Sequence, residues 1–218
     1  MVKLLLKHKF KVLVSLVQHS FSIMDLLFAT ANKHKLQEAG EILGPGFILT
    51  TPAALGFTGE IPETADTLEE NSLMKASFLW ERFGLPCFAD DTGLLVDSLG
   101  GRPGVYSARY AGPQADSTKN TSLLLKELNG VDNRKARFIT IVTLILSSKD
   151  IYVFEGRAEG WIAKFPYGNG GFGYDPVFIP DGYDKTLAEL SPEEKNIISH
   201  RGKAIRKLSE FLHSYNSR

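Results

Sequence analysis

The alternation of apolar and polar residues divides the first half of the chain into strands and helices that follow one another. Short apolar runs bounded by turn residues predict strands over 25–31 and 46–50. A helical period predicts a helix over 33–43 between them, closed by a Gly-Pro-Gly turn. A capping box at Thr67 begins a second helix, which is expected to run to about Phe83.

The second half of the chain is expected to contain a long hairpin. Its predicted elements are strands over 86–89 and 94–97, a helix over 116–128, strands over 136–147 and 151–165, and a helix that begins at Ser191 and whose apolar period continues to Leu212. Three turn residues separate the two long strands, so these should pair in antiparallel fashion. Together the elements predict an α/β fold with a mixed twisted sheet and flanking helices, in two lobes around a central cleft.

Composition and charge limit the classes of partner. The chain has 218 residues, 43% of them apolar, which is enough for a substantial core. Its 25 basic and 25 acidic side chains cancel, so no global field would hold it on a nucleic acid or an anionic membrane. Cys87 is the only cysteine, which excludes an internal disulfide and fits a reducing compartment. We therefore expect a cytoplasmic protein without a nucleic acid or membrane partner, whose thiol lies in the core.

The first 23 residues differ in character from the rest. They carry four lysines and no acids, and Gln18 and His19 interrupt their apolar stretch. The stretch is too short to span a bilayer and has no small-residue cleavage site. We interpret residues 1–23 as an extension outside the fold, with a targeting segment as the alternative, and residues 24–218 as a single domain.

Two adjacent carboxylates, Asp90 and Asp91, interrupt an apolar stretch. A buried charge costs several kcal/mol unless an opposite charge meets it. A basic side chain, a metal ion or bulk water at a strand end could each supply the compensation. Near a polyphosphate, such carboxylates can hold Mg²⁺, and one of them can accept a proton from an attacking water molecule.

Two basic stretches could bind phosphate. Residues 30–35 lie where the first strand turns into the first helix, and a helix N-terminus with lysines favours anions. The alternative is an ordinary capped helix whose lysines point into solvent. Asn71 and Lys75 share one helix face, where they could clamp a ligand oxygen or remain on the surface.

Two further stretches could bind the rest of a ligand. The glycine-rich segment 168–176 ends in Phe172, Tyr174 and an acid, which favours stacking on a flat ring over a simple wide turn. The segment 199–202 combines a serine, a histidine and an arginine, which can donate to carbonyl or phosphate oxygens. No serine occupies a G-x-S-x-G elbow, so a serine hydrolase triad is not supported.

Taken together, these stretches resemble one family in order and in register over about residues 25–214. The matching motifs are TANKHK at 30–35, EENSLMKA at 69–76, FADDTGL at 88–94, GGRPGVYSARYAG at 100–112, GNGGFGYDP at 168–176 and EEKNIISHRGKA at 193–204. They are the pattern of the noncanonical purine nucleoside triphosphate pyrophosphatases, the inosine triphosphatase or Ham1 family. The resemblance implies hydrolysis of ITP, dITP and XTP to the monophosphate and pyrophosphate, with Mg²⁺ as cofactor and a homodimer as the usual assembly.

The resemblance also assigns roles to residues. It implies that Asp91 is the proton acceptor and a metal ligand, with Asp90 and Lys75 as the other catalytic residues. The substrate-binding residues that it implies are Thr30, Ala31, Asn32, Lys33, His34, Lys35, Asn71, Thr92, Phe172, Gly173, Tyr174, Asp175, Lys195, His200 and Arg201. Thr92 replaces the serine of the family, and Pro62 occupies one of two places that often carry glutamates, which leaves Glu63 as the second metal ligand.

Two other functions remain open at this point. A Maf-type pyrophosphatase would act on pyrimidine or modified nucleotides, although SHRGKA and FGYDP argue against it. A nucleotide-binding regulator without catalysis is the alternative from a different class. The intact Asp90, Asp91 and Lys75 argue against a regulator.

Overall fold

The computed structural model describes residues 24–215 and contains a mixed sheet. Seven strands in this part of the chain run in the order β2-β1-β3-β5-β6-β7, with β4 paired to β3. Their bounds are β1 Met24–Phe28, β2 Phe47–Thr50, β3 Cys87–Val96, β4 Pro103–Gly104, β5 Lys135–Ile145, β6 Ile151–Ile162 and β7 Phe178–Pro180. β1 is parallel to β2 and β3, whereas the pairings of β3, β5, β6 and β7 are antiparallel. The mixed sheet and the long β5–β6 hairpin are therefore confirmed.

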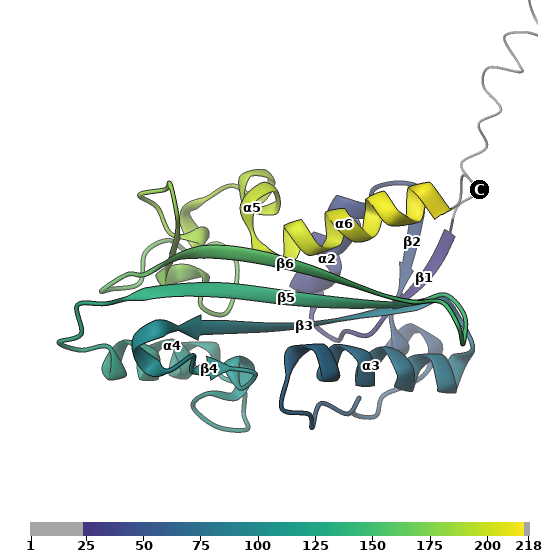
Figure 1. The fold of residues 1–218 in the computed structure, drawn as a ribbon, viewed down its shortest axis with the longest axis horizontal. Coiled ribbons are helices and arrows are strands. Elements are labelled where there is room, and N and C mark those ends of the chain that lie inside the picture. Colours follow the sequence, from purple (N-terminus) through teal and green to yellow (C-terminus); the bar gives the residue numbers. More distant parts are fainter. Residues whose placement is uncertain (1–23, 216–218) are drawn as a thin grey trace, which may run out of the picture.

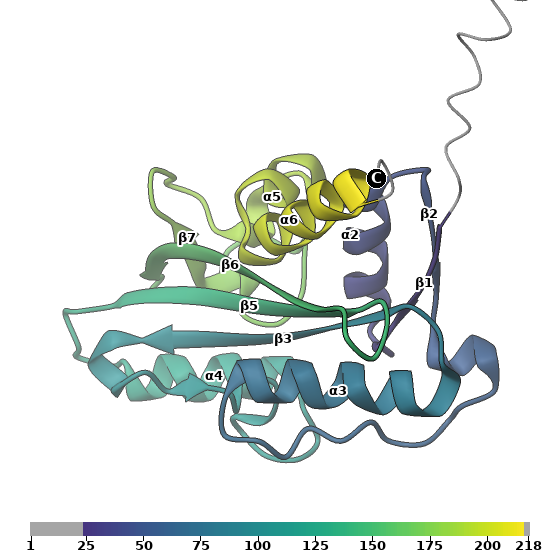
Figure 2. The same cartoon turned by 45° about the vertical axis from the view of Figure 1, so that its right-hand side comes forward.

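Helices cover both faces of this sheet (Figure 1). They are α2 Lys33–Leu43, α3 Leu68–Phe83, α4 Ser117–Glu127, α5 Pro192–Ile198 and α6 His200–Tyr215. Figure 2 shows α2 beside α6 on one face and α3 on the other. Leu208 of α6 packs in one apolar cluster with Val142, and Leu79 of α3 packs in another with Cys87. The predicted α/β class and the buried thiol are confirmed, while the two lobes remain a prediction.

Some expectations concern parts or properties that the described residues do not test. The prediction of an extension over 1–23 lies outside residues 24–215. The prediction of one domain over 24–218 stays a prediction. Across the described range, no helix combines the length and the apolar character needed to cross a membrane.

The strand that carries the paired aspartates differs from its prediction. Two strands were expected on either side of Asp90 and Asp91, but β3 runs through both without interruption. Its register against β5 pairs Asp90 with Val142 and Asp91 with Ile141. The prediction was wrong because it treated the two charges as a strand end, whereas basic side chains from helices packed on the sheet compensate both of them.

The C-terminal helix is also different from its prediction, because it is two helices. Ser199 separates α5 from α6 with extended backbone angles, φ −67° and ψ 156°. Its hydroxyl accepts from the amide of Gly202 at 3.0 Å and so caps the start of α6. The break places His200 and Arg201 in the first turn of α6 rather than inside a longer helix.

A glycine on β6 allows this first turn to lie directly on the sheet. A Cβ atom at Gly156 would overlap the carbonyl oxygen of His200 and lie 2.5 Å from the amide nitrogen of Ala204. Only hydrogen fits between the strand and the helix at this point. The position of His200 relative to the sheet thus depends on the absence of a side chain at Gly156.

Replacing Gly156 with alanine should separate α6 from β6. We expect the free energy of unfolding to fall by about 1–3 kcal/mol, because added atoms in a tightly packed contact force the backbone apart. Urea denaturation of the variant measures this loss. Gly40→Ala is the matched control: no described residue lies within 4 Å of a Cβ there, and the exposed helix position should gain roughly 0.5–1 kcal/mol. Equal stability of wild type and Gly156→Ala would contradict the close contact.

Candidate active site

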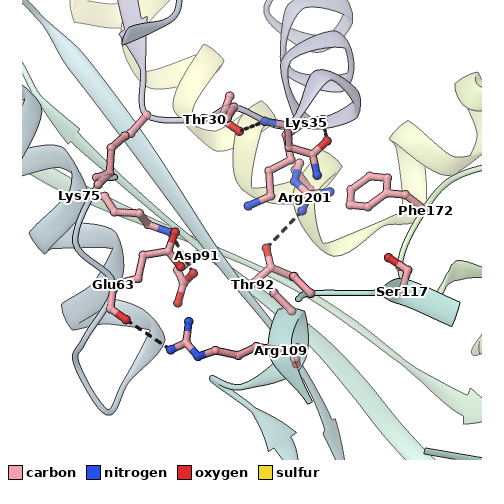
Figure 3. A pocket seen from close by; sticks show the side chains of 18 of the residues that line it. Thr30, Lys35, Glu63, Lys75, Asp91, Thr92, Arg109, Ser117, Phe172 and Arg201 are labelled. Atoms are coloured by element: carbon pink, nitrogen blue, oxygen red, sulfur yellow. Dashed lines mark hydrogen bonds and ion pairs between the residues drawn. The ribbon is translucent and has the colours of Figure 1, made fainter. Parts of the chain in front are cut away.

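A cavity of about 920 Å³ gathers most of the predicted site residues. Those that line it are Thr30, Ala31, Asn32, Lys35, Glu63, Lys75, Asp91, Thr92, Phe172, Gly173, Tyr174, Asp175, His200 and Arg201. Figure 3 shows that their side chains reach the cavity from several elements that are far apart in the sequence. Five predicted residues do not line it, namely Lys33, His34, Asn71, Asp90 and Lys195.

The two adjacent aspartates have different surroundings because successive strand residues point to opposite faces of a sheet. Asp91 lines the cavity on the side of α3, where it contacts Lys75. Asp90 points to the other face, toward α2 and α6. The pair therefore does not act as one two-carboxylate site.

Asp90 is fully engaged by basic side chains. Its oxygens accept from Lys35 Nζ at 2.8 Å and from Arg201 Nε at 3.1 Å, and the residue is 1% exposed. Burial alone would raise the pKa of Asp90, but the charges of Lys35 and Arg201 outweigh it and hold the pKa well below its usual range. A basic side chain, a metal ion or bulk water could each have compensated the charge of Asp90. In the structure, basic side chains compensate it. Asp90 thus holds Lys35 and Arg201 in place beside the cavity that both of them line.

The ion pairs of Asp90 continue into a network of further charged side chains. Glu38 accepts from Arg201 at 2.8 Å and from Lys195 at 2.7 Å, and Lys195 also donates to Asp175 at 2.7 Å. Asp175 in turn accepts from the amide of Phe172 at 2.8 Å. Lys195 thus does not line the cavity itself. Through Asp175, it holds the loop that carries Phe172.

Asp91 forms a second cluster of charge with Lys75 and Glu63. Lys75 Nζ lies 2.9 Å from Asp91 Oδ1 and 3.4 Å from Glu63 Oε1. Burial raises the pKa of Asp91, which strengthens its affinity for a proton although Lys75 opposes the shift. Burial would lower the pKa of Lys75, but Asp91 and Glu63 raise it, so the ammonium stays charged. The cluster combines a proton acceptor, a cation and a second carboxylate.

Of the predicted binding residues that do not line the cavity, Asn71 and His34 have contacts within the fold, and Lys33 is exposed. The Asn71 side chain accepts from the Ala65 amide at 2.9 Å and donates to the Ala65 carbonyl at 3.3 Å, so it fastens the loop before α3. The His34 ring stacks on Phe172 with centroids 5.4 Å apart. Lys33 is exposed in the first turn of α2. The helix-face argument placed Asn71 correctly beside Lys75 but could not foresee that a loop backbone would use its amide.

His200 is buried and neutral at the back of the cavity. Its ring stacks on Phe138 with centroids 4.3 Å apart, and its Nδ1 atom has no hydrogen-bond partner among the described residues. Burial lowers the pKa of His200 well below its ordinary value, and the positive charges of Arg201 and Lys195 add to this effect. A neutral ring keeps one donor and one acceptor nitrogen.

Comparison with known proteins assigns the chain to a family. The sequence profile of the Ham1 family matches residues 26–211. The chain belongs to the Ham1 family. This agrees with the resemblance of the six motifs and with the α/β fold.

Individual members of the family support the same assignment. The dITP/XTP pyrophosphatase of Flavobacterium johnsoniae is 47% identical over 189 residues, which cover 87% of this chain and 98% of that protein. The dITP/XTP pyrophosphatase of Bacillus subtilis is 47% identical over 191 residues, 86% of this chain and 96% of that protein. The solved structure of the Staphylococcus aureus Ham1 protein superposes with a TM-score of 0.80 at 36% identity, covering 88% of this chain and 99% of that one.

Two residues of this Ham1 site carried no role in the sequence analysis. Glu38 joins Arg201 to Lys195, and its only sequence signal is its place three residues after Lys35 on the same helix face. Arg109 lines the cavity and donates to the carbonyl of Glu63 at 3.3 Å. It belongs to a quoted motif, but nothing in the motif alone says that its side chain reaches the site.

His200 should make stability depend on pH. Its pKa in the folded chain lies below that of the unfolded chain, about 6.5. Below this pH the unfolded chain binds a proton that the folded chain does not, so stability is complete above it and falls as pH falls. Urea denaturation at about pH 7 and about pH 5 should give a smaller loss for His200→Asn than for wild type. His34→Asn, which removes an exposed imidazole, is the control, and equal losses in all three proteins would contradict the prediction.

Proposed function

We propose that this chain hydrolyses ITP, dITP and XTP to the nucleoside monophosphate and pyrophosphate, and so removes noncanonical purine nucleotides from the pool. The observation that carries the proposal is the cluster of Asp91, Lys75 and Glu63 in the same cavity as the aromatic ring of Phe172. One end of the cavity suits phosphoryl chemistry and the other suits a flat base. Relatives at 47% identity with the name dITP/XTP pyrophosphatase support the same reaction.

In the proposed reaction, Asp91 accepts a proton from water while the water oxygen attacks the α-phosphorus. The bond from the α-phosphorus to the bridging oxygen breaks, and its electron pair leaves with pyrophosphate. Lys75 holds Asp91 in place at 2.9 Å and offsets phosphate charge. Thr30, Asn32 and Lys35, at the start of α2, line the same cavity and would contact the phosphates.

The donor set suits Mg²⁺. Asp91 and Glu63 both approach the ammonium of Lys75, so two carboxylates already converge on a cation. Within residues 24–215, no group of three or more His, Cys, Asp or Glu side chains forms a closed metal cage. Mg²⁺ commonly uses one or two carboxylates and takes its other ligands from substrate phosphates and water. We infer that Asp91 and Glu63 would hold Mg²⁺, which neutralises phosphate charge when bound.

The residues around Phe172 support selection of the base. Phe172 offers a stacking surface, with Lys195 Nζ and Arg201 Cζ at 4.9 and 5.2 Å from its ring centroid. The guanidinium of Arg201 can only donate, so it suits the O6 acceptor of hypoxanthine and xanthine. Adenine carries a donor at this position and would leave a buried donor unpaired, which can discriminate strongly.

Assembly as a homodimer stays a prediction. The pyrimidine-directed and the inactive alternatives are separated from the proposed reaction by the measurements below.

Purified protein with Mg²⁺ should release pyrophosphate from dITP, ITP and XTP, and should turn over ATP at least about tenfold more slowly because of the unpaired donor. Parallel assays of pyrophosphate and free phosphate with GTP, UTP and dTTP complete the measurement. Preference for UTP or dTTP would favour the pyrimidine-directed alternative. Tight dITP binding without turnover would favour a regulator, and release of free phosphate would mean a different bond is cleaved.

Asp91→Asn should reduce turnover of dITP by about 10²–10⁴-fold, the usual contribution of a general base. Binding of a non-hydrolysable dITP analogue should remain measurable by calorimetry, because Lys75 and Phe172 are unchanged. Asp97→Asn is the matched control, since Asp97 follows β3 near the surface and its one ion pair within residues 24–215 is with Arg137. Activity of Asp91→Asn near that of the wild type would mean that another group accepts the proton.

A further inference from the structure

Arg109 differs from the other cations of the cavity in having no ionic partner. Lys35 pairs with Asp90, Lys75 with Asp91 and Glu63, and Arg201 with Asp90 and Glu38. Among residues 24–215, Arg109 forms no ion pair, and the one hydrogen bond of its side chain goes to a neutral carbonyl, that of Glu63. It is therefore the lining cation whose charge is still available to an anion.

The geometry of Arg109 leaves most of its donors free. A guanidinium has five N–H donors in one plane, and only Nη2 is used, at 3.3 Å from the Glu63 oxygen. The Cζ atom of Arg109 lies over the ring of Tyr106, 5.5 Å from the centroid. This contact uses none of the N–H donors, so the remaining donors can bind phosphate, which a guanidinium can do in bidentate fashion.

Arg109 lies at the end of the cavity away from the aromatic ring. In Figure 3 it lies beside Glu63 and Asp91 and apart from Phe172. A nucleotide with its base at Phe172 and its α-phosphate at Asp91 extends its last phosphates beyond Asp91. At the other basic position, the start of α2, Asn32 already caps the amides of His34 and Lys35 and Asp90 already holds the Lys35 ammonium. Arg109 therefore adds a cation without an ion-pair partner among residues 24–215 to the phosphate contacts proposed at the start of α2.

We propose that Arg109 binds the terminal phosphates of the substrate and stabilises pyrophosphate as it leaves. The inference rests on the proposed function, because it takes the leaving group from that reaction. As the bridging bond breaks, negative charge grows on the leaving oxygen and spreads into pyrophosphate, and a fixed cation there lowers the barrier. Arg109 would exchange its contact with the Glu63 carbonyl for phosphate oxygens, or keep one donor on each.

Direct binding of the two products separates this role from a structural one. Calorimetry in the presence of Mg²⁺ should show pyrophosphate binding at least about tenfold weaker for Arg109→Gln than for wild type, since a charged hydrogen bond is lost. Binding of inosine monophosphate should stay within about twofold, because it lacks the phosphates that Arg109 contacts. Arg109→Lys should recover part of the loss, since it keeps the charge without the planar fork.

Arg102→Gln is the matched control, because Arg102 lies in the same segment, pairs with Glu127 at 3.2 Å and does not line the cavity. It should bind both products like the wild type. Equal weakening of pyrophosphate and inosine monophosphate by Arg109→Gln would mean that Arg109 only fastens the Glu63 loop, and would overturn the proposal. Unchanged pyrophosphate binding, or none by the wild type, would overturn it as well.

The two proposals can fail separately. A wild-type chain that releases no pyrophosphate from dITP or XTP contradicts the proposed function, whatever the calorimetry gives. A wild-type chain that releases pyrophosphate, with Arg109→Gln equal to it in pyrophosphate affinity, contradicts only the role of Arg109.

Discussion

Asp90 lies in the middle of β3, and its carboxylate binds Lys35 of α2 and Arg201 of α6. The two contacts hold the first turns of two helices to one residue of the central strand. These turns come from opposite ends of the described chain, and their contacts with Asp90 bring Lys35 and Arg201 to the same cavity. The other charges of this network, Glu38 and Lys195, extend the same constraint to the loop that carries Phe172.

Burying such a network of charges costs desolvation free energy, and its benefit is that it fixes the positions of the side chains. Desolvating buried ions costs about as much as their attraction returns, whereas removing one partner leaves an unpaired charge and costs about 3–5 kcal/mol. The chain therefore gains little net stability from placing charges at Asp90, Arg201 and Glu38 instead of apolar side chains. It gains side chains whose positions are fixed before a substrate binds, which is the condition for electrostatic stabilisation of a transition state.

The alternation of a strand gives two neighbouring aspartates separate roles. Asp90 faces the helices α2 and α6 and is saturated by cations, whereas Asp91 faces the cavity with one ammonium beside it. Burial raises the pKa of Asp91, while the cations lower that of Asp90. A carboxylate suited to accept a proton and one that cannot do so thus stand next to each other in sequence, separated by the plane of the sheet.

Local signals in the sequence determined most elements of the fold. The bounds of α2 agree with the predicted 33–43, and α3 begins after the predicted cap Thr67, because capping residues, glycine stops and apolar periods act within a few residues. The motifs also identified most of the residues that line the cavity. The prediction of two strands failed where distant contacts decide the outcome, because cations from three helices allow β3 to continue through both aspartates. The break at Ser199 was missed although its cap is local, because the apolar period continues across it.

The roles of individual side chains were decided by tertiary structure. Nothing near Asn71 in the sequence reveals that its amide binds Ala65, and nothing near Glu38 reveals that it joins Arg201 to Lys195. The sequence by itself determined which elements form and which residue types are available to the site. Only the tertiary structure decided which charges are already neutralised and which, such as Arg109, remain free, because ion pairing depends on distances of a few ångströms between residues far apart in the chain.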